Sequence, residues 1–447
     1  MKDKLIFIFL VFIIILSLIF SYTNIIYFNY LKSIIWSIVT IILVFSGIYF
    51  SIKLKFIQFN FIKIFKSLFN DSNGNISTFE SLSINLAAKI GVGSLSGIAL
   101  SIVIGGIGSI FWMWIITLIT SILAYIEGYL GVKYQSKDKF NNLVGGPSFY
   151  LDKVTNSKIL PIFYSLLIII SYIFGFITIQ SNTIVKSVSY VFDVNKYIIL
   201  IIIVFFSGFI IFNGIKKIAT FSAKIVPVMG LIYMILGIYI IIVNIDIIPS
   251  IIINIIKSAF NFKSFLSGFI GCMIIGIQRG IFATEIGVGT SAISSSLTND
   301  NEKTQGYVQL FGIYFTTFII CTVTALIIIS ANIDISNYVN INGIEFVIDA
   351  FVYHLGDIGT YLFIIITILF AFSTIVSGYC FGELALTYVI SKVNNKIKFL
   401  FKLLTIILIF IGGIISPNII WNIIDIVIAL LTIINLYSIY LLRNKIK

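Results

Sequence analysis

The tripeptide Gly-Val-Gly occurs twice in this chain, at Gly91–Gly93 and at Gly287–Gly289, and each copy interrupts a long apolar stretch. Glycine has no Cβ, so the backbone can leave the helical conformation there at little cost. Unwound backbone presents amide and carbonyl groups that can bind ions and small polar solutes. In lipid such a break survives only where it lines a cavity or is buried by protein. Both copies are therefore candidate binding sites.

The alternative is that these glycines only let helices pack closely, as small residues often do in membranes. The surrounding residues favour a binding site, because the copies align as Lys89-Ile90-Gly91-Val92-Gly93-Ser94 and Glu285-Ile286-Gly287-Val288-Gly289-Thr290. Packing alone does not require matched positions in two halves of a chain. Paired glycine interruptions are instead typical of secondary transporters built from inverted repeats. The sequence therefore predicts a transporter.

The composition predicts an all-α integral membrane protein. Hydrophobic residues make up 59% of the 447 residues, and charged residues only 10%. A soluble domain with this surface would precipitate. The net charge of +12 does not indicate nucleic-acid binding, because the lysines lie between the apolar runs and form no single patch. Topology explains them more simply.

Other function classes lack their signatures. The three cysteines, Cys272, Cys321 and Cys380, all lie in apolar stretches and indicate no disulfide framework. His354 is the single histidine, which argues against a zinc cluster. The chain contains no HExxH, GxSxG or P-loop sequence, so we do not expect an enzyme.

The apolar runs predict about 12 transmembrane helices, each long enough to cross the hydrocarbon layer. The predicted spans are 5–22, 34–51, 79–103, 108–131, 160–185, 197–214, 221–243, 264–292, 304–331, 358–390, 402–416 and 418–442. The two Gly-Val-Gly copies then lie in the first helix of each set of five, running in opposite directions. We therefore expect N-terminal helices with an interfacial segment (1–78), a first inverted repeat (79–243) and a second repeat with the C-terminus (244–442), in one membrane domain.

The distribution of lysine and arginine predicts that both termini are cytoplasmic. With an inside N-terminus, most of these residues fall in connections on the inner side, as the positive-inside rule requires. Residues 5–22 also resemble a signal sequence. A signal core is usually shorter, about 7 to 15 residues, and no A-x-A-like cleavage site follows Ser21, so we favour a retained helix. The outer segment 332–357 is expected to cap the site.

Several ordered motifs over residues 34–442 resemble one family. They are Asn85–Ser94, Gly105–Trp114, Gly145–Tyr150, Gly214–Ile218, Arg279–Gly289, Ala371–Thr374 and Trp421–Asp425. These segments are similar to those of the alanine or glycine:cation symporters of bacteria and archaea, which have the LeuT-type five-plus-five fold. The resemblance implies uptake of a small neutral amino acid, driven by Na+ or alternatively by H+, in a prokaryotic cell membrane. It implies lipid but no nucleic acid as a partner, and no oligomeric state is predicted.

The chain also departs from the family pattern. Gly91-Val92-Gly93-Ser94 stands where Gly-Thr-Gly-Asn is usual, so a hydroxyl and a carboxamide are lost. Lys89 replaces an arginine, Ile107 a proline, and Thr316 an aspartate. Two alternatives therefore stay open. One is a proton-coupled carrier of another small amino acid, and the other is a transport-impaired sensor of the same fold.

The resemblance and the helix dipole together assign the substrate site. The substrate carboxylate is expected at amides around Gly93, Ser94 and Leu95, where the outer half-helix begins. Released carbonyls of the second break would accept from its ammonium group, and Phe282 would form a lid. The predicted substrate-binding residues are Gly91, Val92, Gly93, Ser94, Gln180, Asn182, Phe282, Thr284 and Gly287. Without the resemblance, Gln180 and Asn182 are equally well the polar end of a helix, and Phe282 is an ordinary core or lipid-facing residue.

The resemblance also implies a sodium site formed by Ser373 and Thr374 with the carbonyls of Ala87 and Ile90. Ser and Thr in membrane helices more often bond the carbonyl four residues earlier, which is the structural alternative.

Charged residues inside membrane spans are costly and default to function or pairing. We expect Lys89 and Glu285 to form a pair that brackets the site, with Arg279 competing for Glu285, and Asp425 to join an external gate. Glu127 and Glu383 fall near the inner ends of their spans, where snorkelling to water is the simpler interpretation.

Overall fold

The computed structural model describes residues 25–70, 76–260, 270–334, 343–390, 394–415 and 417–446. The predicted span 5–22 lies outside these residues. Within them the chain is helical apart from short connections and one small hairpin, β1 (Ser136–Lys137) with β2 (Leu143–Val144), in which Ser136 pairs with Val144.

The first predicted repeat begins with a helix broken in two. Its helices are α4 (Thr78–Lys89) and α5 (Ser96–Gly105), α6 (Ser109–Lys133), α8 (Ile159–Ile169) continued by α9 (Ile177–Val191), α10 (Lys196–Ile211) and α11 (Ile215–Val243). A capping box starts α4, because Ser77 accepts from the Glu80 amide and the Glu80 carboxylate accepts from the Ser77 amide. A π-helical segment, Ile170–Phe176, joins α8 to α9.

The second predicted repeat follows the same order. Its helices are α13 (Ile270–Thr284) and α14 (Thr290–Ser295), α15 (Glu302–Tyr314) continued by α16 (Thr322–Ser330), α18 (Asp357–Val389), α19 (Asn395–Gly412) and α20 (Pro417–Leu441). A second π-helical segment, Phe315–Cys321, joins α15 to α16. Helix α2 (Ile25–Lys53) precedes both sets, and the connections carry α3 (Phe61–Ser67), α7 (Pro147–Val154), α12 (Ile248–Ala259) and α17 (Ile344–Leu355).

The predicted count of 12 spans is not confirmed. Among the described residues, seven helices are long and apolar enough to cross a membrane, or eight if the bent pair α4 and α5 is one span. Helices α10 and α13 are shorter, at 16 and 15 residues. Helix α19 has 18 residues, but its first half contains Lys396, Lys398 and Lys402. It is therefore too charged to be counted as a membrane-spanning helix by composition. Most predicted span ranges coincide with the observed helices to within about six residues, but α2 and α19 begin nine and seven residues before the spans predicted for them.

Both Gly-Val-Gly sequences interrupt their helices, as predicted. The axis bends by 58° between α4 and the segment that includes α5. At the second break Glu285, Gly287 and Gly289 all have left-handed backbone, with φ of 55°, 81° and 102°. This conformation is strained for any residue with a Cβ, so glycine is required at positions 287 and 289.

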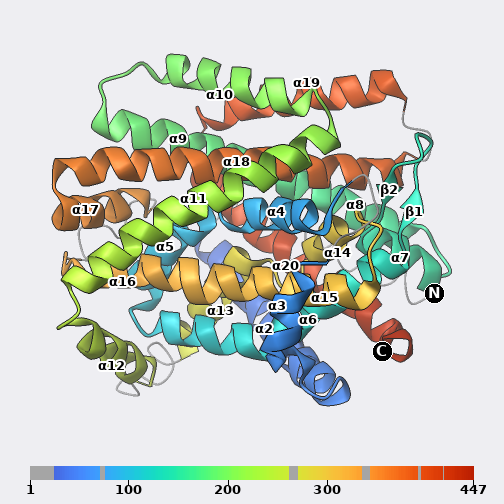
Figure 1. Cartoon of the computed structure of the whole chain (residues 1–447), viewed down its shortest axis with the longest axis horizontal. Coiled ribbons are helices and arrows are strands. Elements are labelled where there is room, and N and C mark those ends of the chain that lie inside the picture. Colours follow the sequence, from blue (N-terminus) through green and yellow to red (C-terminus); the bar gives the residue numbers. More distant parts are fainter. Residues whose placement is uncertain are drawn as a thin grey trace.

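The broken helices lie inside the bundle. Figure 1 shows α11 crossing α18 obliquely, with α4 beneath them, and these three helices contact one another. Helix α14 packs against α4 and α6, while α17 covers α5 and α18. The outward faces of α10 and α11 expose large apolar side chains such as Phe205, Phe209 and Leu231, which is appropriate for contact with lipid. The breaks are therefore surrounded by protein.

The backbone at Gly289 generates a stability prediction. A Cβ there would need left-handed φ and would meet Pro147 and the Tyr164 hydroxyl. We expect Gly289→Ala to destabilise the protein by about 1–3 kcal/mol. Gly97→Ala is the matched control, because nothing lies within 4 Å of an added Cβ there. The thermal unfolding midpoint in detergent measures both changes. Equal midpoints for the two variants would contradict the strained geometry at Gly289.

Candidate functional site

Side chains from α9 and α18 hold the first break open. The Val92 amide donates to Gln180 Oε1 at 3.1 Å, and Gly91 lies so close to the Thr374 hydroxyl that a Cβ would collide with it. Ser94 Oγ donates to the Gly91 carbonyl at 2.8 Å. The structure thus brings together Gly91, Val92, Ser94 and Gln180, as the sequence predicts.

The amides around Ser94 are not the free groups that we predicted. The Ser94 and Leu95 amides donate to the Gly91 and Val92 carbonyls, both at 3.1 Å, and so close a short 3₁₀ turn, Val92–Ser94. The turn forms because a broken helix still satisfies its backbone locally when it can. Helix α5 begins at Ser96, and its first-turn amides are the ones without an intrahelical acceptor. An anion would therefore bind two or three residues later than predicted.

Asn182 does not lie at the break. Its Nδ2 donates to the carbonyls of Gly412 and Ile415, at 3.4 and 2.9 Å, where α19 ends. Residues two apart on a helix point about 200° apart, so Gln180 and Asn182 cannot face the same cavity. The prediction that both complete one polar ring is wrong for Asn182.

Protein side chains already donate hydrogen bonds to two carbonyls of the second break. Asn435 Nδ2 donates to the Gly287 carbonyl at 2.8 Å, and the Tyr164 hydroxyl donates to the Val288 carbonyl. The Thr284 hydroxyl turns back to the Gly280 carbonyl, at 2.7 Å, within its own helix. The Gly287 carbonyl is therefore partly satisfied by protein, and Thr284 presents no hydroxyl to a ligand in this conformation.

An aromatic layer covers the first break. The Phe282 ring lies against Gly93, where an added Cβ would stand 3.1 Å from it. Phe282 also packs on Phe176 and Trp421, with ring centroids 5.1 and 4.8 Å away. Phe176 belongs to the π-helical segment, a geometry that is frequent at functional sites. Phe282 thus lies where a lid over Gly93 would lie.

Charged residues lie above this layer. Asp425 on α20 pairs with Lys32 at 3.3 Å and with Arg279 at 3.9 Å. The Arg279 guanidinium also lies 5.5 Å from the centre of the Trp421 ring. Arg279 thus contacts Asp425 and Trp421, and among the described ion pairs it does not compete for Glu285. This group, with the aromatic layer, is called the outer gate below, after the role that the sequence predicts for Asp425.

Lys89 and Glu285 do not form the direct pair that was predicted. Among the described ion pairs neither residue appears, and Lys89 Nζ donates instead to Ser291 Oγ at 3.2 Å. Glu285 has left-handed backbone, with φ of 55°, and interacts with Lys89 electrostatically without a direct ion pair. Snorkelling is also wrong for Glu127, which is fully buried and accepts from Asn435 at 2.8 Å. Glu383 pairs with Lys398 at 3.4 Å.

The neighbouring hydroxyls of α18 face different helices. Thr374 Oγ1 donates to the Ala87 carbonyl at 2.8 Å, at the end of α4. Ser373 Oγ contacts Met229 Sδ on α11 at 3.5 Å and donates to the Phe370 carbonyl at 2.9 Å. Thr374 also bonds the Phe370 carbonyl, four residues earlier in its own helix, at 2.9 Å. This is the bond that Ser and Thr in membrane helices commonly make, so Thr374 makes both contacts. Only Thr374 of the two contacts a carbonyl near the first break.

Sequence reasoning missed three residues that hold the breaks. Asn435, Tyr164 and Thr324 bond carbonyls of the broken segments, Thr324 through the Ser94 carbonyl at 3.0 Å. Asn435 could have been found, because a carboxamide within an apolar span is costly unless it has a specific partner. The hydroxyls of Tyr164 and Thr324 carry no such signal among many Tyr and Thr residues.

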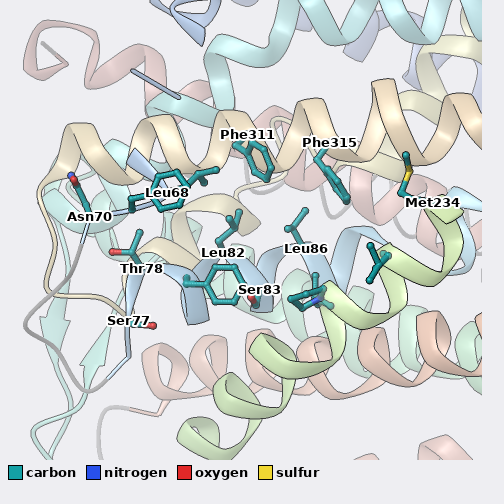
Figure 2. Close-up of a pocket in the computed structure, with 16 residues that line it drawn as sticks. Leu68, Asn70, Ser77, Thr78, Leu82, Ser83, Leu86, Met234, Phe311 and Phe315 are labelled. Atoms are coloured by element: carbon teal, nitrogen blue, oxygen red, sulfur yellow. The ribbon is translucent and has the colours of Figure 1, made fainter. Parts of the chain in front are cut away.

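A separate hollow of about 680 Å³ lies on the other flank of α4. Figure 2 shows Leu82 and Leu86 of α4 facing Phe311 and Phe315 across it, with Asn70, Ser77 and Thr78 at one end. Helix α11 contributes Gly230 and Met234 to its wall. The hollow is mostly apolar and is distinct from the polar break at Gly91.

Two broken helices buried in one bundle define a secondary transporter of the LeuT type. The solved structure described as "MhsT in complex with L-phenylalanine" matches with a TM-score of 0.54 and 16% identity, covering 81% of this chain and 88% of that one. This likeness supports the fold.

The chain belongs to the sodium:alanine symporter family, whose model matches residues 12–447. It is 32% identical to the amino-acid carrier protein AlsT of Bacillus subtilis, over 92% of this chain and 88% of AlsT. It is also 32% identical to the probable sodium/glutamine symporter GlnT of the same organism, over 92% of this chain and 87% of GlnT. The protein is thus a multi-pass membrane transporter for amino acids and not an enzyme.

The different partners of Thr374 and Ser373 give a matched pair of variants. Removing the Thr374 hydroxyl takes away the group that reaches the Ala87 carbonyl, so Thr374→Val should raise the sodium concentration needed for half-maximal thermal stabilisation by roughly tenfold. Ser373→Ala should change it little. Thermal unfolding of the purified protein over a series of sodium concentrations, with potassium holding the ionic strength, measures both. An equal response in the two variants would remove Thr374 from the ion site.

Proposed function

We propose that this protein takes up a small neutral amino acid, alanine or glycine, together with sodium across a prokaryotic cell membrane. The observation that carries the proposal is the contact of Thr374 with the Ala87 carbonyl, directly beside the Gly91 break. A sodium ion at this point would gain hydroxyl and carbonyl oxygens from two different helices. Its binding would therefore fix α4 against α18.

A small substrate suits the surface beneath the outer gate. Gly91 and Gly93 have no side chains, and the Phe282 ring closes on Gly93 from above. A carboxylate would bind the first-turn amides of α5, where the helix dipole is favourable. Gln180 bonds the break through its carbonyl oxygen only, and its Nε2 lies near Gly91, where it could donate to the substrate.

Sodium entry supplies enough free energy for accumulation. Each ion that enters down about 100 mV contributes about 2.3 kcal/mol. A tenfold concentration gradient adds about 1.4 kcal/mol. Together these support several-hundredfold accumulation of substrate by one ion. A proton that replaces sodium is the second candidate, and a transport-impaired sensor is the third.

In this proposal alternating access depends on the outer gate at one end of the broken helix and on the apolar hollow beside α4. The outer gate is closed in this conformation, with Asp425 paired to Lys32 and Arg279. The apolar hollow gives the inner half of the broken helix, α4, a space into which it can tilt. In this proposal residues 79–243 and 244–442 are the inverted repeats, residues 1–78 are accessory, and both termini face the cytoplasm.

Transport of labelled alanine and glycine into proteoliposomes tests the proposal. We expect uptake with an inward sodium gradient that exceeds uptake with a potassium gradient by roughly tenfold or more, because only sodium would join α4 to α18. A proton gradient without sodium is the second arm and would favour the proton-coupled alternative. Absence of gradient-driven uptake of any neutral amino acid, from protein that still unfolds cooperatively, would favour the sensor.

The hollow beside α4 gives a second test. A Cβ at Gly230 would meet only the Phe315 ring, at 3.7 and 4.0 Å, so a longer side chain can enter the hollow. We expect Gly230→Leu to slow uptake roughly tenfold by opposing the tilt of α4, while substrate binding is kept.

Gly208→Leu on α10 is the control for this variant. An added Cβ there meets only Ile406, at 3.7 Å, and lies far from the hollow in sequence and outside its lining. Its uptake should equal that of the parent protein. Normal uptake by both variants would show that α4 does not need this space.

A further inference from the structure

Three buried ionisable groups lie beside the second break and are not used by the proposed sodium and substrate sites. Lys89 is 2% exposed, Glu127 0% and Glu285 2%. They come from three parts of the fold: the end of α4, the last third of α6, and the break itself. Lys89 acts electrostatically on both carboxylates, so the three form one group, which we call the buried triad.

The triad has one positive charge for two carboxylates. Its other neighbours are neutral: Ser291 accepts from Lys89 at 3.2 Å, and Asn435 donates to Glu127 at 2.8 Å. The titratable groups that face it from α7, α8 and the π-helical segment are tyrosines, Tyr150, Tyr164 and Tyr172. An uncompensated charge in such a buried place is expensive. Charge balance therefore requires one further cation.

The hydrogen bonds around the triad are also incomplete. Glu127 Oε2 and Glu285 Oε2 are buried and have no donor in hydrogen-bond geometry. The Gly289 amide and the Ser291 hydroxyl act on Glu127, and the hydroxyls of Tyr172 and Thr290 act on Glu285, without completing a hydrogen bond to these two oxygens. A buried carboxylate oxygen without a donor is costly, whereas a protonated carboxyl group becomes a donor and removes part of that cost.

We propose that Glu127 and Glu285 share one exchangeable proton, while Lys89 stays charged. A proton fits better than an alkali ion, because the Lys89 ammonium group would repel an alkali ion at close range. A proton needs no coordination shell and makes the triad neutral.

The proton site is separate from the proposed sodium site. Thr374 of α18 reaches the Ala87 carbonyl, whereas the Lys89 side chain reaches Ser291 of α14. Ala87 and Lys89 point about 200° apart on α4. Glu127 and Glu285 belong to other elements and contact neither Thr374 nor Ala87 in the described hydrogen bonds. The two cations would therefore bind on opposite faces of the same broken helix.

The position of the proton gives it a role in the transport cycle. It would lie where α4, α6 and α14 meet, and Asn435 connects Glu127 to the Gly287 carbonyl. Loss of the proton would place a net negative charge between the two breaks. The inference goes beyond the proposed function, since the protein would carry this proton whether or not sodium drives uptake.

Infrared difference spectroscopy of the purified full-length protein tests the proposal without any substrate. A buried protonated carboxyl group has a C=O stretch separate from carboxylate bands. We expect such a band in the parent protein and its disappearance as the medium is made alkaline. Glu127→Gln and Glu285→Gln should each abolish it, because Lys89 then balances the one remaining carboxylate. Lys89→Met should increase it about twofold, because both carboxyl groups would then be neutral.

Glu383→Gln is the control, since Glu383 pairs with Lys398 away from the triad, and it should leave the band unchanged. Absence of the band at every pH at which the parent protein stays folded would overturn the proposal, and this measurement requires no variant. Survival of the band in either glutamine variant, or its displacement by sodium at constant pH, would also overturn it.

Discussion

The fold depends on satisfying backbone polar groups that are deprived of helical partners inside a membrane. Each such group costs several kcal/mol in hydrocarbon if it stays unpaired. This protein meets the requirement with side chains from helices that do not break. Gln180 and Thr324 bond the first broken segment, and Tyr164 and Asn435 bond the second. The surrounding bundle is therefore needed to keep the breaks open.

The sequence predicted the breaks and the helices well, because both depend on local properties. A long apolar run predicts a helix in lipid, and a glycine pair within it predicts an interruption. Thr374 and Gln180 reach the Gly91 break as expected. Among the described residues the span count is not confirmed where helices are short or charged, as in α10 and α19.

The errors concern relations between helices. Asn182 was predicted from its nearness to Gln180 in sequence, but helical phase turns it to the end of α19. The pair of Lys89 with Glu285 was predicted from repeat symmetry, which does not reveal that Ser291 accepts the hydrogen bond of Lys89 instead. Glu127 was interpreted from its distance to the end of a span, whereas it is buried where α14 packs against α6 and Asn435 of α20 donates to it. None of these facts can be read from a single helix.

Lys32 links the outer gate to a helix outside the two predicted repeats. Its ammonium group contacts both Asn422 and Asp425, at 3.1 and 3.3 Å, and its side chain is 20% exposed. Any movement that separates α20 from α2 must break this contact. Because the contact is partly open to water, dissolved salt screens it. Ionic strength is thereby coupled to how firmly α20 is held against a helix outside the two predicted repeats.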